Sequence, residues 1–420
     1  MFTNLFCSIL FSLFLIINLV ACDNSANESK KFEGLGKLEC QGQQIRNEFI
    51  VQWKDGRISK VKNMNQEQFV NKFIKDNYNE ILTSEPNYRL NFSDNSVKSQ
   101  ATCSKGNWSI DNINVKKLWD EGITGKDVVI AVTDSGVDIN HPALKNRIAF
   151  NTGESGLDSN GKDKSNNGID DDNNGYVDDY YGYDFIDNDN NPGDTTGHGT
   201  AVAGVIASEH ITFKNSRGSN QRIYGVAPGA KIIPIRFIGS FGADTQTAVN
   251  SLKYAVARGA KIINASWGGK DCSSILPNYV KTLEQKNLLF VAASGNEFLD
   301  LDNLGRRAPV YPASLNLKNQ ITVGAIGFFG NKVGFSNYGH NSVELFAPGS
   351  EIITLAPNSG NTCYDGTSFA APIVSGTLAL LIEAYPDASL LEIKNLILNN
   401  VRSSKNYINL TNGTLDLGNL

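Results

Sequence analysis

Short apolar runs alternate with amphipathic segments along most of the chain, beginning near Trp108. The apolar runs are too short for helices and are predicted to be strands buried on both faces, at residues 128–133, 232–237, 262–265, 288–292 and 321–325. Segments with helical spacing accompany them, at residues 200–208, 245–258, 279–286 and 369–384. Because parallel neighbours require helix-length crossovers, this pattern predicts an α/β domain with a mainly parallel central sheet flanked by helices.

A smaller pattern precedes this domain. Residues 49–53 form a strand pattern, and residues 66–78 place Phe69, Phe73 and other apolar side chains at helical spacing. One face of that helix could pack on the strand, while the polar residues 91–98 are typical of a linker. The sequence therefore predicts a small α+β N-terminal unit.

The first 21 residues contain no charged side chain and are almost entirely apolar from residue 5 to residue 20. This run is shorter than the ~20 residues that span a bilayer, so residues 1–21 are predicted to be a signal peptide. Leu19-Val20-Ala21-Cys22 resembles the bacterial lipoprotein processing box, which implies acylation of Cys22 and a tether over residues 22–47. The expected location is the cell envelope, on the extracytoplasmic side of a bacterial membrane. A plain secretory signal or an uncleaved anchor are the alternatives.

Composition adds one local feature. The 40% hydrophobic and 19% charged residues are ordinary for a globular protein, and the net charge is −5. Residues 158–194 alone hold eleven Asp and two Lys, a local charge of −9. No basic run accompanies this acidic segment, so nucleic-acid binding is not expected. We expect a monomer.

Three segments carry residues suited to hydrolysing an amide, which needs a nucleophile, a base, a group that orients the base and donors for the oxyanion. Asp134 ends a buried strand, His198 opens a helix rich in small residues, and Ser368 begins a long apolar helix. The amide groups and dipole at that helix start favour negative charge developing beside Ser368.

These segments occur in the chain order Asp, His, Ser, and a fourth block is Ala292-Ala293-Ser294-Gly295-Asn296. Together they resemble the signature blocks of subtilisin-like serine proteases, over about residues 108–420. The resemblance implies a subtilisin-like three-layer fold and a serine endopeptidase. It implies that Ser368 is the nucleophile, His198 the general base and Asp134 its orienting partner, with oxyanion donors from Asn296 and the Ser368 amide.

Further segments resemble the substrate-binding parts of that family. Ser266-Trp267-Gly268 and Ser294-Gly295 resemble the walls of the S1 pocket. Residues 238–242, which include Ser240, resemble the edge that pairs with an extended substrate, although an ordinary loop is the alternative. No acidic residue lies in the wall segments, so a basic P1 residue is not indicated. Protein or peptide substrates are expected, without a catalytic cofactor.

The acidic insert, at residues 156–194, contains oxygen-bearing side chains at alternate positions. Asp170, Asp172, Asn174, Tyr176 and Asp178 are the candidate metal ligands, with Gly175 allowing a sharp turn. This is like the first half of a calcium loop, but Tyr181 stands where an EF-hand has its terminal Glu. Many subtilisin relatives use calcium structurally, so structural calcium is predicted here. A merely solvated acidic loop is the alternative.

Four cysteines remain once Cys7 and the predicted lipid-bearing Cys22 are set aside: Cys40, Cys103, Cys272 and Cys363. An even number in an exported chain suggests disulfides, with buried free thiols as the alternative. The family fold brings Cys272 close to Cys363, and a Cys40–Cys103 bond would hold the N-terminal segment to the rest.

That N-terminal segment has a family counterpart too. Residues 48–100 resemble a shortened inhibitory propeptide, with residues 84–88 as its last strand, and a retained structural module is the alternative. Residues 101–420 would form the peptidase domain. The favoured function is an envelope-anchored endopeptidase. A catalytically silent calcium-binding surface module with the same fold is the competing hypothesis, and a maturation protease dedicated to one partner is a narrower version of the first.

Overall fold

The computed structural model describes residues 42–90, 97–98, 103, 105–214, 220–270, 273–304 and 309–420. The predicted signal peptide, the predicted lipidation site Cys22, and the cysteines Cys40 and Cys272 lie outside the described residues.

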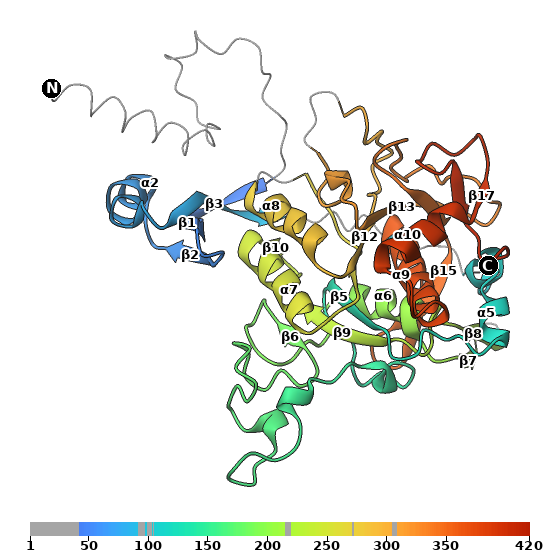
Figure 1. Ribbon diagram of the computed structural model, residues 1–420, viewed down its shortest axis with the longest axis horizontal. Helices are drawn as coiled ribbons and strands as arrows, with labels where there is room; N and C mark the ends of the chain where they lie inside the picture. Colours follow the sequence, from blue (N-terminus) through green and yellow to red (C-terminus); the bar gives the residue numbers. More distant parts are fainter. Residues whose placement is uncertain are drawn as a thin grey trace.

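A nine-stranded sheet forms the centre of the peptidase domain (Figure 1). Its neighbouring strands run parallel except for the antiparallel pair at one end, β17 and β18. In spatial order the strands are β17 (Val401–Ser403), β18 (Gly413–Leu415), β14 (Leu345–Pro348), β13 (Gln320–Ile326), β12 (Leu289–Ala293), β11 (Ile262–Ala265), β5 (Val129–Asp134), β9 (Lys231–Arg236) and β6 (Tyr183–Asp184).

Helices cover both faces of this sheet. On one face pack α6 (His198–Ala207), α9 (Thr367–Ala384) and α10 (Leu390–Asn399); on the other pack α7 (Thr245–Ala257) and α8 (Ile275–Thr282). Successive residues of β5 alternate between the two hydrophobic clusters, with Ile130 and Val132 in the first and Ala131 in the second. Burial on both faces explains why the strands are continuous apolar runs. The predicted three-layer α/β fold is confirmed.

The observed elements lie close to the predicted ones. β11 has the predicted bounds, and the other four predicted strands differ by one residue at each end. α8 begins earlier than predicted, at Ile275, and the 3₁₀ helix η5 (Leu283–Gln285) continues it. The sequence analysis missed β6, β14, β17, β18 and α10. β6 and β18 are two and three residues long, too short to produce a recognisable pattern.

α9 is long and apolar enough to cross a membrane by length and composition, yet 83% of its apolar window is buried inside the protein. It contacts β11, β12, β13 and β14 and is the central helix of the larger core. Its apolar character is therefore explained by burial in the domain.

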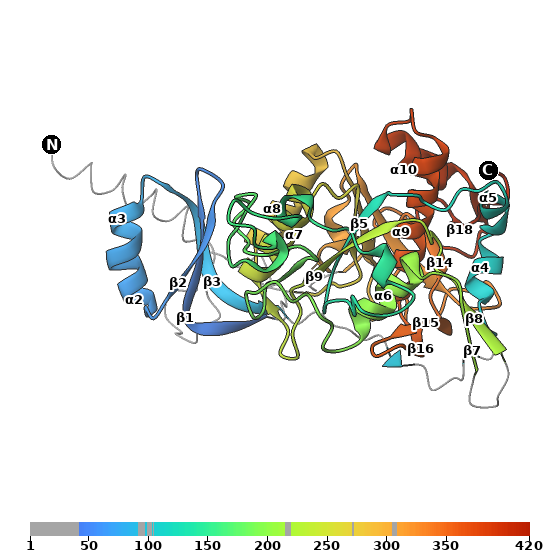
Figure 2. The ribbon, with the colours of Figure 1, turned by 90° about the horizontal axis from the view of Figure 1, so that it is seen from below.

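The N-terminal unit is an antiparallel sheet with one helical segment on it (Figure 2). Its strands are β1 (Gly42–Trp53), β2 (Ile58–Lys62) and β3 (Ile81–Leu90), and its helical segment consists of α2 (Gln66–Gln68), η1 (Phe69–Ile74) and α3 (Lys75–Asn77). Phe49 stacks on Phe69 with ring centroids 4.0 Å apart, so the predicted helix packs on the predicted strand. β1 begins at Gly42, which places the start of this unit earlier than the expected residue 48.

Smaller elements complete the domain. They are β4 (Val97–Lys98), α4 (Trp108–Asn112), α5 (Lys116–Asp120), β7 (Ile211–Lys214), β8 (Asn220–Ile223), β10 (Ala243–Asp244), β15 (Ile352–Ala356), β16 (Gly360–Asp365) and the 3₁₀ helices η2 (Lys145–Arg147), η3 (Thr152–Glu154), η4 (Lys164–Asn166) and η6 (Ala313–Leu315). The acidic insert begins just after η3, carries η4 and extends from the body of the domain in Figure 1.

The predicted disulfide pairing is wrong. Cys103 is bonded to Cys363, with Cα atoms 5.8 Å apart, so neither the Cys40–Cys103 nor the Cys272–Cys363 bond can form in this state. The reason is that β4 pairs antiparallel with β16 at Tyr364 and Asp365. Residues 97–98 thus pair with the strand that carries Cys363, and Cys103 lies a short distance further along the chain.

Candidate active site

Asp134 and His198 form a buried pair at the carboxyl end of β5. The Nδ1 atom of His198 lies 2.8 Å from Oδ1 of Asp134, and the residues are 6% and 0% exposed. The Ser135 backbone amide also donates to Asp134 Oδ1. Burial raises the pKa of the Asp134 carboxyl, while the His198 ring and this hydrogen bond act in the opposite direction.

Local packing explains how α6 reaches Asp134. Gly199 directly follows His198, and a Cβ at this position would lie 2.0 Å from the Gly136 carbonyl oxygen and 3.1 Å from the Asp134 Cβ. Only glycine allows the first turn of α6 to approach the end of β5 this closely. Glycine beside the histidine is therefore a packing requirement of the pair.

Asp194 links the same two elements, and the sequence analysis did not single it out. One carboxylate oxygen accepts hydrogen bonds from the Ser135 hydroxyl and from the Thr196 and Gly197 amides. The other accepts from the amide and hydroxyl of Thr200, in the first turn of α6. A carboxylate at a helix N-terminus satisfies otherwise unpaired amide groups. Asp194 thereby fixes the direction in which α6 leaves the loop.

Ser368 is the second residue of α9 and is 4% exposed. Its carbonyl oxygen accepts a hydrogen bond of 2.8 Å from the Ser266 hydroxyl, which in turn accepts one from the Asn264 side chain. Ser375, two turns further along α9, donates to the other end of the Asn264 amide. The start of α9 is thus tied to the carboxyl end of β11.

Asn296 lies against the same helix start. Its Oδ1 atom accepts hydrogen bonds from the amide and the hydroxyl of Thr367, at 2.9 and 3.0 Å, and the Gly295 amide donates to that hydroxyl. Because its Oδ1 atom is directed to Thr367, the side-chain amide nitrogen of Asn296 points away from Thr367. The structure thus brings Asn296 to the residue directly before Ser368.

An aromatic pair joins His198 to the start of α9. The Phe369 ring meets the His198 ring nearly edge-on, with centroids 5.4 Å apart, and stacks on Tyr364 at 4.6 Å. Phe369 is fully buried. Because Phe369 directly follows Ser368, this contact holds the imidazole beside the helix start that carries the serine. The structure therefore places the His198 ring against the residue that directly follows Ser368.

A cavity of about 220 Å³ opens beside the Asp134–His198 pair. It is lined by both of these residues and by Ser240, Ser266 and Trp267 from the predicted substrate-binding segments, among others. Trp267 packs against Phe237 and donates its indole N–H to the Thr133 hydroxyl, so its ring forms a fixed wall. Gly268, Ser294 and Gly295 lie outside the lining of this cavity.

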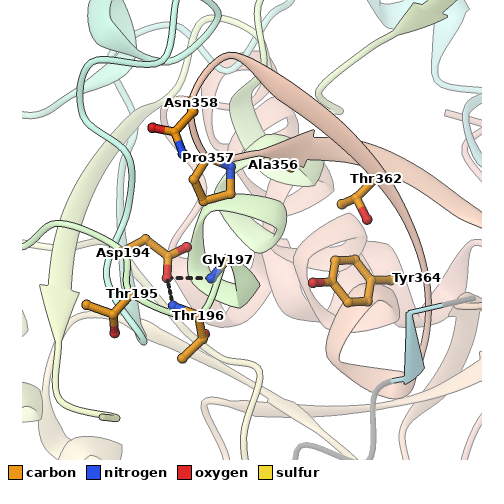
Figure 3. A pocket seen from close by; sticks show the side chains of 9 residues that line it. All are labelled: Asp194, Thr195, Thr196, Gly197, Ala356, Pro357, Asn358, Thr362 and Tyr364. Atoms are coloured by element: carbon orange, nitrogen blue, oxygen red, sulfur yellow. Dashed lines mark hydrogen bonds between the residues drawn. The ribbon is translucent and has the colours of Figure 1, made fainter. Parts of the chain in front are cut away.

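A second hollow, of about 270 Å³, lies between the loop that precedes α6 and the β15–β16 hairpin (Figure 3). Asp194, Thr196 and Gly197 line it from one side and Pro357, Thr362 and Tyr364 from the other. Tyr364 also stacks on Phe369, so this hollow borders the aromatic pair beside His198.

The predicted substrate-pairing edge at residues 238–242 differs in the structure. Gly239 and Gly242 exchange two backbone hydrogen bonds of 3.0 Å, so this segment closes on itself as a tight turn. The extended edge begins just after it, at β10, and β3 of the N-terminal unit pairs with that edge in antiparallel fashion. The glycines and the serine of the segment favour the turn.

The N-terminal unit also contacts both helices on its side of the sheet. Glu85 of β3 is 3% exposed and accepts hydrogen bonds from the Ser273 hydroxyl and from the amide and hydroxyl of Ser274, at the start of α8. Along α7, the Gln246 side chain donates to the Ile58 carbonyl. These contacts, which the sequence pattern did not indicate, hold β2 and β3 against α7 and α8.

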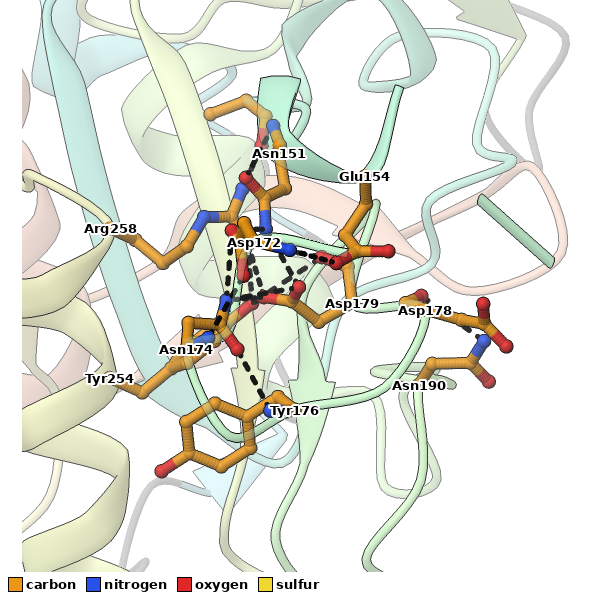
Figure 4. Close-up of polar contacts among 12 residues, drawn as sticks. Asn151, Glu154, Asp172, Asn174, Tyr176, Asp178, Asp179, Asn190, Tyr254 and Arg258 are labelled. Carbon is orange, nitrogen blue, oxygen red and sulfur yellow. Dashed lines mark hydrogen bonds and ion pairs between the residues drawn. The ribbon is translucent and has the colours of Figure 1, made fainter. Parts of the chain in front are cut away.

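Asp170 and Asp172 of the acidic insert lie near Glu154, a residue that the sequence analysis did not select. Figure 4 shows Glu154 and Asp172. One oxygen from each carboxylate lies within 4.8 Å of the others. Glu154 is fully buried; one of its oxygens accepts from the Asp171 and Asp172 amides, and the other has no hydrogen-bond partner among the described residues. Burial raises the pKa of this carboxyl.

The other three predicted metal ligands have different surroundings. Asp178 turns away from the cluster and accepts hydrogen bonds from the Asn167 and Gly168 amides. Asn174 donates to Asp172 and Asp179, and the Tyr176 ring packs on Tyr183, Phe185 and Tyr254. An EF-hand-like set that includes Asp178 is therefore not assembled. Glu154 left no signal in the sequence, because it lies before the acidic run.

The subtilase family (Peptidase S8) matches residues 125–414. Thermitase from Thermoactinomyces vulgaris is 34% identical over 278 residues, which cover 66% of this chain and 82% of thermitase. Subtilisin E from Bacillus subtilis (strain 168) is 27% identical over 401 residues, covering 91% of this chain and 90% of that protein. Subtilisin-like protease 2 from Plasmodium falciparum (isolate 3D7) is 33% identical over 298 residues, and this chain spans only 19% of its length.

Among solved structures, a cold adapted subtilisin-like serine proteinase aligns with a TM-score of 0.54 and 27% sequence identity. The alignment covers 70% of this chain and 90% of the other. The expected fold and the expected enzyme class, a serine endopeptidase of the subtilisin type, agree with these relatives. The chain therefore belongs to the subtilase family of serine proteases.

Proposed function

We propose that this protein is an exported serine endopeptidase in which Ser368 attacks the peptide bond, His198 transfers the proton and Asp134 orients His198. The observation that carries the proposal is the buried contact of 2.8 Å between His198 Nδ1 and Asp134 Oδ1, next to the start of α9. A histidine held in this way keeps its proton on Nδ1 and leaves Nε2 as the base.

The reaction would follow from these positions. The Ser368 hydroxyl loses its proton to His198 as its oxygen attacks the substrate carbonyl. The Asn296 amide and the Ser368 backbone N–H would stabilise the resulting oxyanion, aided by the N-terminus of α9. His198 then returns the proton to the leaving amine, and water hydrolyses the acyl-enzyme by the same route.

The N-terminal unit is proposed to restrain this activity in the way that its resemblance to a propeptide implies. Its strand β3 occupies the edge of β10, beside the cavity that His198 lines, and an extended substrate would need the same edge. Hydrogen bonds from Ser273 and Ser274 to the buried Glu85 support a stable resting state. Removal of the unit would open the edge.

We also propose structural calcium in the acidic insert. Calcium prefers oxygen ligands, and the residues present supply them: three carboxylates converge, and one buried oxygen of Glu154 has no hydrogen-bond partner among the described residues. Glu154, Asp170 and Asp172 would hold the ion. It would neutralise their mutual repulsion and would take no part in hydrolysis. The alternative is a solvated loop stabilised by its own hydrogen bonds.

Anchoring to a bacterial membrane through an acylated Cys22 completes the proposal. Its support is the apolar segment at residues 5–20 and the processing box that ends at Cys22. The intact mass and N-terminal sequence of the protein purified from membranes would test it. A mass increase carried by an N-terminal Cys22 supports the anchor, and an unmodified N-terminus contradicts it.

A fluorophosphonate probe, which labels an activated serine, tests the proposed catalytic function. We expect stoichiometric labelling of the active protein at Ser368 and none in Ser368→Ala. The matched control is Thr377→Ala, which removes a buried hydroxyl that donates to the Ile373 carbonyl within the same helix and should leave labelling intact. Folded protein that binds calcium but neither reacts with the probe nor cleaves any peptide would instead support the silent surface module.

A further inference from the structure

A shielded ion pair joins the N-terminal unit to the peptidase domain. Lys60 of β2 contacts Asp244, and the two side chains are 16% and 14% exposed. Asp244 is also the N-cap of α7, where its Oδ1 atom accepts a hydrogen bond of 3.0 Å from the Thr247 amide. Oδ1 of Asp244 thus caps α7, while Oδ2 contacts the Lys60 ammonium group of the N-terminal unit. A largely shielded ion pair is screened less by salt than an exposed one.

A second cation from the N-terminal unit lies at the same place. β3 pairs with β10 so that Leu90 is opposite Ala243 and Arg89 is opposite Asp244. The Arg89 guanidinium donates to the Phe241 carbonyl oxygen at 3.2 Å. The peptidase domain therefore presents a carboxylate and a carbonyl oxygen at this edge. The N-terminal unit supplies Arg89 from β3, the strand that occupies the edge, and Lys60 from β2.

This edge leads directly to the proposed catalytic residues. Gly242, which precedes Ala243, lines the cavity that also includes Asp134 and His198. The Leu90 carbonyl lies so close to Gly242 that a Cβ there would be 2.7 Å from the carbonyl oxygen. A chain that lay on β10 in the position of β3 would continue past this cavity. Main-chain pairing supplies affinity in such an arrangement, and individual side-chain contacts supply specificity.

We propose that Asp244 is a specificity determinant: it selects substrates with a lysine or arginine at a fixed position on the N-terminal side of the cleaved bond. The inference rests on the proposed function and adds a substrate class to it. Lys60 and Arg89 occupy this subsite in the resting chain, and a basic residue of the substrate takes their place. A carboxylate with one oxygen committed to a helix cap stays fixed in position, which favours selection by charge.

The test uses the full chain and a series of fluorogenic peptides. Each peptide carries a single arginine at one of the positions from two to about seven residues before the cleaved bond, against an otherwise identical alanine peptide. We expect kcat/KM to rise about tenfold at one position, the equivalent of ~1.4 kcal/mol, and to fall when glutamate replaces that arginine. Both peptides are compared on one protein sample. The ratio of their kcat/KM values therefore does not depend on the fraction of molecules in which the β10 edge is unoccupied.

The decisive variant is Asp244→Asn, because asparagine caps a helix as well as aspartate does but carries no charge. The arginine-to-alanine ratio should fall to about one in this variant. In Lys60→Ala the ratio should persist, since the carboxylate remains. Two results would overturn the inference: an arginine-to-alanine ratio that is unchanged in Asp244→Asn, or a wild-type protein without preference at any position. Asp244 would then only hold the N-terminal unit in place through Lys60. Failure to cleave any peptide would refute the proposed function instead.

Discussion

The Nδ1 atom of His198 lies 2.8 Å from Oδ1 of Asp134, in a site from which solvent is almost excluded. Replacing the carboxylate with the amide of Asn should keep the shape but favour the wrong tautomer of the imidazole. We expect Asp134→Asn to lower kcat by about 10⁴ with little change in KM. Steady-state kinetics on a peptide substrate would measure this, with an unchanged melting temperature as the control. A loss of less than tenfold would contradict the assigned role.

Asn296 should contribute to the transition state and little to substrate binding. Its oxygen is engaged by Thr367, so its amide nitrogen is the part that can serve an oxyanion. We expect Asn296→Ala to reduce kcat by about 10²–10³ at nearly constant KM. Labelling of Ser368 by fluorophosphonate should continue at a lower rate. A higher KM at unchanged kcat would indicate a binding role instead.

Phe369 should make the enzyme tolerant to oxidation. Many family members carry methionine after the nucleophile, and a sulfoxide there introduces a polar group. The fully buried phenyl ring, stacked on Tyr364, offers no sulfur to oxidise. We expect the wild type to retain activity in dilute peroxide and Phe369→Met to lose it. Rapid inactivation of the wild type would show that another oxidisable group controls activity.

Calcium should raise the melting temperature through Glu154. A ligand at a hundredfold excess over its Kd stabilises the folded state by about 3 kcal/mol, so EDTA should lower the melting temperature by several degrees. Glu154→Gln should abolish this difference. Asp163→Asn makes the same change of charge at an exposed position of the insert and should preserve it. Indifference of the wild type to EDTA would remove calcium from the proposal.

Glu344 should make stability depend on pH. Burial raises the pKa of this carboxyl to about 7 from 4.5, with Lys394 3.7 Å away acting against the shift. Between these two values the folded state retains a proton that the unfolded state releases, so this contribution to stability is complete below pH 4.5 and is lost as the pH rises through 7.

The matched variant is Glu344→Gln, which keeps an acceptor for the Thr322 amide and does not titrate. Relative to this variant, the wild type should lose up to about 3 kcal/mol of unfolding free energy between the two pH values, because each pKa unit is worth about 1.4 kcal/mol. Urea titrations at several pH values would measure the difference. A constant difference would refute the expected titration.

The sequence was most informative where local pattern and chemistry coincide. A continuous apolar run ending in Asp134 predicts both a buried strand and a side chain at its carboxyl end, and β5 has both. The segments around His198, Ser368 and Asn296, which resemble family signature blocks, likewise lie at the start of a helix or just after a strand. Five adjacent strands of the central sheet could therefore be predicted before any contact was known, and so could the positions of the candidate catalytic residues at the ends of these elements.

Contacts between distant segments could not be assigned in this way. The Cys103–Cys363 bond depends on the pairing of β4 with β16. β4 has only two residues, too few to predict a strand from the sequence. Lys60 and Asp244 are 184 positions apart, and each looks like an ordinary surface charge in the sequence. Glu154 precedes the acidic loop that it joins. Such partners are determined by the path of the chain through space, which local periodicity does not encode.

The bond between Cys103 and Cys363 spans 260 positions and closes most of the peptidase domain into a covalent ring. A cut anywhere inside that ring, such as in the projecting acidic insert, breaks the backbone without releasing a fragment. A nicked molecule should migrate as one species under non-reducing electrophoresis and separate into two only after reduction. When molecules of the same protease cleave one another, this disulfide keeps the two fragments of a nicked molecule together, so the domain retains its arrangement.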